Sequence, residues 1–190
     1  MIPRFVLHIL LLFCYFPIVF TSSTRLHLAE KHYNKAADAY KRNQLAEALR
    51  EYRITMFYGG ESAELLNNTG AVLLSMDKSD EALKWFIKAK QKDPGLLAVR
   101  VNLGIAFYEL RRWEDLLRES NSVLAMGTED GWVFFGHGVA LYHLGKYNKA
   151  RENLKISLTK QRPSGNNDYA GEARRLLRKI KLLTKETGRF

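Results

Sequence analysis

The feature that most constrains the fold of this chain is a helix-pair pattern that recurs with a period of 34 residues. Four copies begin in strict register at Ala29, Ala63, Leu97 and Gly131, and the last copy ends near Ser164. A fixed period of roughly 20–50 residues is typical of a solenoid, in which each unit buries its hydrophobic face only by stacking on its neighbours. The period therefore predicts an all-α solenoid of four stacked helix pairs.

Small side chains recur at two positions of the repeat, when each repeat start is counted as position 1. At position 8 they would let the first helix approach its neighbour closely, and at position 20 they mark the close contact on the second helix. The larger Leu116 is the exception, and we expect it to splay the third unit and change the local pitch. The residues at these two positions are Ala36, Gly70, Gly104 and Gly138, followed by Ala48, Ala82, Leu116 and Ala150.

This pattern resembles the tetratricopeptide repeat (TPR) family over about 135 of the 190 residues. The resemblance implies a right-handed superhelix in which the first helix of each unit lines a concave groove. Such architectures usually bind other proteins rather than catalyse reactions. Unit one departs from the family pattern at His32 and Lys35, where apolar residues are usual. The four units would span residues 29–62, 63–96, 97–130 and 131–164.

A last helix is predicted from residue 167 to residue 185. Its apolar residues are spaced by three and four positions, so they form one face that would cap the end of the stack. The opposite face is basic and consists of Arg174, Arg175, Arg178, Lys179, Lys181 and Lys185.

The first 23 residues differ in character from the repeats. Arg4 precedes an apolar run from Phe5 to Phe20, and small polar residues follow the run, an arrangement that is typical of a signal peptide. The run is shorter than the ~20 residues of a comfortable transmembrane helix, although a retained membrane anchor is the alternative. We therefore expect an exported protein that is periplasmic or membrane-anchored in the cell envelope, or secreted if the leader is cleaved.

Residues suited to catalysis are sparse in this sequence. The only cysteine, Cys14, lies in the leader, so the repeats offer no disulfide, catalytic thiol or cysteine–zinc site. The histidines His27, His32, His137 and His143 lack the i, i+4 spacing that brings two metal ligands together on a helix. We expect no enzymatic activity, no cofactor and no metal.

The resemblance also implies which residues face the groove. Position 6 of the first three units holds Asn34, Asn68 and Asn102, whose amides can both donate to and accept from a peptide backbone. Aromatic side chains are frequent binding hot spots. The alternative is that the last helix or the leader covers the aromatic residues, which would make them part of the core. The apolar and aromatic candidates are Val101, Ile105, Tyr108, Trp132, Phe135 and Tyr142, together with His143.

Two functions of different classes fit these observations. The first is a non-enzymatic scaffold that binds a peptide segment or a helix of another protein in the concave groove. The second is electrostatic binding of an anionic membrane surface or an acidic partner through the basic last helix. The chain carries a net charge of +10, and the residues from Gly145 onward include 13 Lys or Arg against 4 Asp or Glu. Export argues against nucleic acid as the partner.

Overall fold

The computed structural model describes residues 4–160 and 169–186, with side chains described for residues 22–160 and 169–185. Within these ranges the chain forms nine α-helices and no strand, which confirms the predicted all-α fold class. The helices are α1 (Arg4–Lys41), α2 (Leu45–Gly59), α3 (Ala63–Ser75), α4 (Ser79–Lys92), α5 (Leu97–Glu109), α6 (Trp113–Ala125), α7 (Gly131–His143), α8 (Tyr147–Thr159) and α9 (Tyr169–Glu186).

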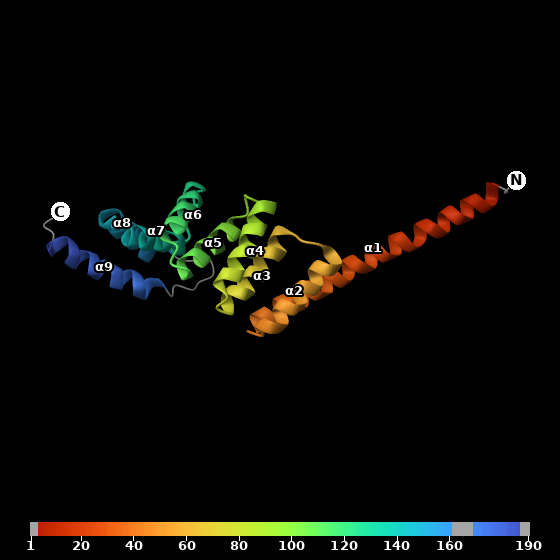
Figure 1. Ribbon diagram of the computed structural model, residues 1–190, viewed down its shortest axis with the longest axis horizontal. Helices are drawn as coiled ribbons and strands as arrows, with labels where there is room; N and C mark the ends of the chain where they lie inside the picture. The colour runs from red at the N-terminus through yellow and green to blue at the C-terminus, as the bar shows by residue number, and fades with distance from the viewer. Residues whose placement is uncertain (1–3, 161–168, 187–190) are drawn as a thin grey trace.

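The helices pair into hairpins that stack along one direction (Figure 1). The four hairpins are α1/α2, α3/α4, α5/α6 and α7/α8, and the second helix of each also packs on the helix that follows it. The first helices α3, α5 and α7 contact one another in succession, and α9 contacts α7 and α8 in the same manner. The first helices therefore form one continuous side of the solenoid, which we call the inner face, and α9 caps its end.

The turn inside each hairpin has the same backbone conformation. Position 15 of every unit has a positive φ, with values of 58° at Asn43, 59° at Asp77, 54° at Arg111 and 73° at Gly145. Asn, Asp and Gly adopt this left-handed region more readily than other residues do. The repeat register therefore extends to the backbone conformation of single residues, and Arg111 is the one member that adopts it at a steric cost.

Close helix contacts depend on small residues, as the sequence predicts. A Cβ atom added to Gly138 would lie 2.8 Å from Cγ of Leu154, so a larger residue would separate α7 from α8. The larger Leu116 is fully buried, and its Cδ1 lies 3.3 Å from the place where Gly136 would carry a Cβ atom. Because Gly136 gives Leu116 this room, the splaying that we expect of the third unit is not required.

The first helix begins much earlier than the repeat pattern predicts. Instead of starting near Ala29, α1 starts at Arg4, and its N-terminal part extends away from the stack in Figure 1. The predicted leader, residues 1–23, falls almost entirely on residues whose side chains lie outside the described part, so its role stays a prediction. Residues 161–168, which include the predicted end of the fourth unit, also lie outside the described residues. Over the ranges that the structure describes, no helix has both the length and the apolar character needed to cross a membrane.

Candidate functional site

The asparagines at position 6 connect successive units across the inner face. The Nδ2 of Asn68 donates a hydrogen bond to Oη of Tyr33 at 2.9 Å, and the Nδ2 of Asn102 donates to Oδ1 of Asn67, also at 2.9 Å. Each bond joins position 6 of one unit to position 5 of the unit before it. Asn34, which belongs to the first unit, is exposed. These amides therefore hold the repeats together, a role that the sequence analysis did not assign to them.

The inner face of α1, α3 and α5 is open. Asn68, Val101, Asn102 and Ile105 are each half-buried, so part of each side chain is displayed beside the exposed Asn34. The surface combines amide groups with small and medium apolar groups. It can offer both hydrogen bonds and apolar contact to a chain laid across it.

The inner face of α7 is closed, and this corrects the expectation for two of the predicted site residues. Trp132 is 7% exposed and Phe135 is 2% exposed, so both belong to the core. The ring of Trp132 lies against Gly104 of α5, where an added Cβ atom would be 3.1 Å from the ring. Phe135 stacks on Tyr169 of α9 with the ring centroids 5.3 Å apart. The last helix thus covers Phe135, which is the alternative considered above, whereas Trp132 packs against α5.

Two other predicted residues, Tyr108 and His143, line a small cavity of about 300 Å³ between α5, α7 and α9. Tyr108 donates a hydrogen bond from Oη to Oε2 of Glu172 on α9 at 2.8 Å, and burial together with this carboxylate raises the pKa of the Tyr108 phenol. His143 stacks on Trp113 with the ring centroids 4.0 Å apart, and its pKa is lowered by burial and by Arg111. Tyr142 is half-buried. The Tyr108–Glu172 bond ties α5 directly to α9.

The last helix is amphipathic, as predicted. Its residues Tyr169, Ala173, Leu176 and Ile180 are buried against the stack. All six members of the predicted basic face are exposed, and one of them, Arg175, forms an ion pair with Glu172 at 2.9 Å. The basic residues Arg174, Arg178, Lys179, Lys181 and Lys185 lie on the same exposed surface of α9.

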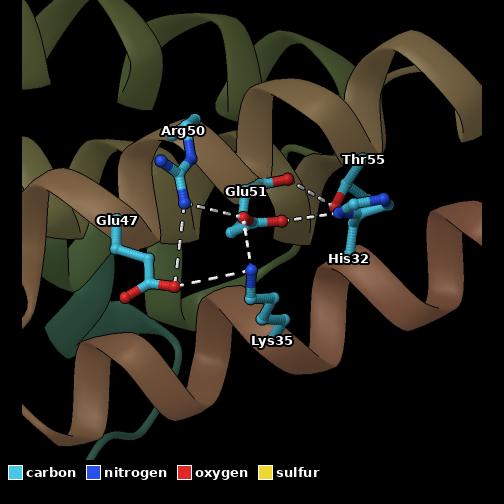
Figure 2. Close-up of polar contacts among 6 residues, drawn as sticks. All are labelled: His32, Lys35, Glu47, Arg50, Glu51 and Thr55. Atoms are coloured by element: carbon cyan, nitrogen blue, oxygen red, sulfur yellow. Dashed lines mark hydrogen bonds and ion pairs between the residues drawn. The ribbon is translucent and has the colours of Figure 1, made fainter.

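A buried carboxylate in the first hairpin forms a polar cluster that the sequence analysis missed (Figure 2). The Glu51 side chain of α2 is 3% exposed and lies 2.5 Å from Nδ1 of His32 and 3.0 Å from Nζ of Lys35, both on α1. Arg50 completes the set at 3.2 Å. Burial alone would raise the pKa of Glu51, but the hydrogen bonds from these three groups outweigh it and lower the pKa to about 2.

A second buried carboxylate occupies the same repeat position two units later. Glu119 of α6 has an 8% exposed side chain and accepts hydrogen bonds from Lys90 of α4 at 2.6 Å and from Arg100 of α5 at 3.0 Å. Glu51 and Glu119 are both at position 23, and their partners His32 and Arg100 are both at position 4. This in-register pairing of opposite charges was the sequence signal for both clusters.

The histidines do not converge on a shared site. His137 is buried in the core with its Nδ1 3.1 Å from Oγ of Ser120, and burial lowers its pKa. In the described part of the chain, no group of three or more His, Cys, Asp or Glu side chains is placed to hold a metal ion.

Solved TPR structures share this helix arrangement. The TPR protein YrrB, whose structure has an unusual peptide-binding site, superposes with a TM-score of 0.62 at 18% identity, covering 69% of this chain and 68% of that one. MamA from Desulfovibrio magneticus RS-1 superposes with a TM-score of 0.67 at 16% identity over 84% of this chain and 96% of its own. A TPR protein from Parabacteroides merdae gives a TM-score of 0.64 at 19% identity over 86% of this chain and 68% of its own.

At these identities the similarity shows the fold, which is that of TPR proteins. No protein-family model matches the sequence, and no curated protein matches it in sequence.

Proposed function

We propose that this chain is a non-enzymatic scaffold that holds a peptide segment or a helix of a partner protein against the inner face of α1, α3 and α5. The observation that carries the proposal is the contrast along that face. Asn34, Asn68, Val101, Asn102 and Ile105 are at least partly displayed, whereas α9 covers the inner face of α7. The binding surface is therefore the N-terminal part of the groove. YrrB, which is similar in fold, has a peptide-binding site.

Apolar contact supplies more of the proposed affinity than the asparagines do. The Asn68 and Asn102 amides already donate one hydrogen bond each within the solenoid. A partner can therefore use only the donor and acceptor positions of each amide that these bonds leave free. Exchange of hydrogen bonds with water makes such contacts worth about 0.5–1.5 kcal/mol each. Covering the half-buried Val101 and Ile105 removes apolar surface from water at about 25 cal/mol per Å².

Site-specific photo-crosslinking tests this surface. A photoreactive amino acid in place of the exposed Asn34 should capture one partner from extracts of the native cell. The same amino acid in place of Lys84, an exposed residue on the second helix α4, is the matched control and should not capture it. Equal capture at both positions, or capture at Lys84 alone, contradicts the proposal.

A second candidate function is supported by the exposed basic face of α9. In this alternative the six basic side chains bind an anionic membrane surface or an acidic partner. Salt separates the two candidates, because binding to anionic headgroups weakens steeply with ionic strength whereas apolar and amide contacts respond little. Sedimentation with vesicles that contain anionic phospholipid, at low and high salt, measures the difference.

We also propose a location in the cell envelope, which rests on the apolar leader before the repeats. Fusion of residues 1–28 to a reporter enzyme that is active only after export tests this location. An inactive reporter would contradict export and would leave the binding proposal standing.

A further inference from the structure

A second open surface lies on α2, outside the inner face. A cavity of about 610 Å³ runs along this helix from Ala46 to Tyr58, and Met76, which follows α3, and His32 of α1 also line it. Its floor is apolar and includes Leu49 and Ile54. Thirteen helical residues rise by about 20 Å. The cavity is therefore an elongated groove, which suits a chain segment better than a compact molecule.

An exposed aromatic ring borders this groove. Phe57 is 73% exposed, the largest exposed fraction among the large apolar side chains of the described residues. Its ring touches only the edge of Tyr58 among the aromatic rings that the structure describes, with the centroids 5.1 Å apart. Exposed apolar groups beside an apolar groove mark a surface for a partner.

The charges around the groove are in positive excess. The cations that line the groove are Arg50 and Arg53 of α2. The neighbouring carboxylates Glu47 and Glu51 pair with Arg50 and with Lys35 of α1. Glu51 is compensated by Lys35, Arg50 and His32, as Figure 2 shows. Arg53 forms no ion pair with any residue that the structure describes. One cation thus stands uncompensated at the border of an apolar groove.

We infer that this groove on α2 binds an acidic amphipathic segment of a partner protein. Its apolar side chains would contact Leu49, Ile54 and Phe57, and its carboxylates would face Arg50 and Arg53. The length of the groove fits a helix of about 13 residues. A second copy of this chain is a poorer occupant, because a net charge of +10 on each copy opposes self-association. This site is separate from the inner face and does not depend on the function proposed above.

Fluorescence anisotropy with the full chain tests the inference. The probe is a labelled helical peptide of about 14 residues, with leucines on one face and glutamates on the other. Its matched control carries lysine at every glutamate position. We expect the acidic peptide to bind and the lysine peptide to show no binding. Equal binding of the two peptides, or no rise in anisotropy with the acidic peptide, overturns the inference.

Substitutions then locate the peptide. Arg53→Glu and Phe57→Ser each alter an exposed side chain on α2, and each should raise the Kd of the acidic peptide about tenfold or more. Lys84→Glu and Ile87→Ser are the equivalent changes on exposed residues of α4 and should leave the Kd unchanged. Circular dichroism checks that every variant keeps its helix content. If Arg53→Glu and Phe57→Ser leave the Kd unchanged, the peptide binds elsewhere and the inference is wrong. Weaker binding by Ile105→Ser would then place the peptide on the inner face, and weaker binding by Lys181→Glu would place it on the basic face of α9.

Discussion

Two carboxylates at the same repeat position, Glu51 and Glu119, are held in different ways. All three partners of Glu51 come from its own hairpin, since His32 and Lys35 lie on α1 and Arg50 lies on α2. Glu119 lies on α6 and pairs with Lys90 of the preceding hairpin as well as with Arg100 of its own. The first cluster therefore stabilises one unit, and the second cluster also fastens the interface between two units.

The difference matters because the stability of a solenoid is approximately a sum of unit terms and nearest-neighbour interface terms. Loss of the Glu51 cluster should loosen the first hairpin alone. Loss of the Glu119 cluster should also uncouple the second and third units, so that unfolding becomes less cooperative. Both effects have the same physical cause. A buried carboxylate that loses its cationic partner still carries the cost of its desolvation, and no ion pair offsets that cost.

The largest effect is expected for Arg100→Ala. The change leaves Glu119 buried with Lys90 as its partner, and we expect a loss of about 2–3 kcal/mol, below the 3–5 kcal/mol typical of breaking a fully buried pair because one cation remains. Urea unfolding followed by circular dichroism measures the loss, and a lower m-value would report reduced cooperativity.

The control for this prediction is Arg112→Ala. Arg112 also pairs with a carboxylate, Asp115, but its side chain is 49% exposed, so its removal should change stability by less than about 0.5 kcal/mol. If the two variants unfold at the same urea concentration, the Glu119 cluster does not fasten the interface.

The next effect concerns acid and the first hairpin. Because the folded state lowers the pKa of Glu51 from 4.5 to about 2, its contribution is present above pH 4.5 and is lost as the pH falls through 2. Between pH 6 and pH 3 this loss amounts to about 1–2 kcal/mol. Hydrogen-exchange protection in α1 and α2, measured against the intrinsic exchange rate at each pH, should fall over that interval in the native chain. It should do so much less in Glu51→Gln, which keeps the shape of the side chain but not its charge. An unchanged pH dependence in the variant would show that Glu51 is not the titrating group.

The repeat register predicted the fold well because it is a local property of the sequence. From Leu45 to Thr159, the starts and ends of equivalent helices recur every 33 or 34 residues, in step with the repeat period. The placement of α9 is not local, since it depends on the packing of Tyr169 against Phe135. For that reason the sequence could not decide whether Trp132 and Phe135 were displayed or covered.

The polar clusters were missed for a different reason. His32 and Lys35 stood out in the sequence as departures from the family pattern, but the units were compared only at positions 6, 8 and 20. Their partner Glu51 lies 19 residues after His32, as Glu119 lies 19 residues after Arg100. Comparing positions 4 and 23 between units would have paired them. The asparagines at position 6 were predicted to bind the peptide of a partner protein. In the structure, Asn68 instead donates a hydrogen bond to Tyr33 of the preceding unit.

A smaller effect is expected when the pair in the third unit is replaced as a whole. The second unit has Leu66 and Trp85 at positions 4 and 23, so an apolar pair is compatible with the fold. The double change Arg100→Leu with Glu119→Leu should stay within about 1 kcal/mol of the native stability, because replacing a buried ion pair by packed apolar groups is often close to neutral. Urea unfolding of the double variant and of Arg100→Ala under the same conditions compares their stabilities. A double variant less stable than Arg100→Ala would mean that the pair itself stabilises the interface.

The smallest effect should come from the asparagine bonds, which also connect units but at a partly exposed surface. Asn102→Ala removes the bond to Asn67, and we expect a loss of about 0.5–1 kcal/mol, because the hydrogen bond exchanges with water and is worth little net. Asn34→Ala is the matched control at the same repeat position, and its exposure predicts a change within about 0.5 kcal/mol. Thermal unfolding of the two variants measures the difference. If Asn102→Ala loses as much stability as Arg100→Ala, the hydrogen bonds between asparagine side chains stabilise the interface between units as strongly as the buried ion pairs do. The expectation that buried ion pairs stabilise these interfaces more than asparagine hydrogen bonds do would then be wrong.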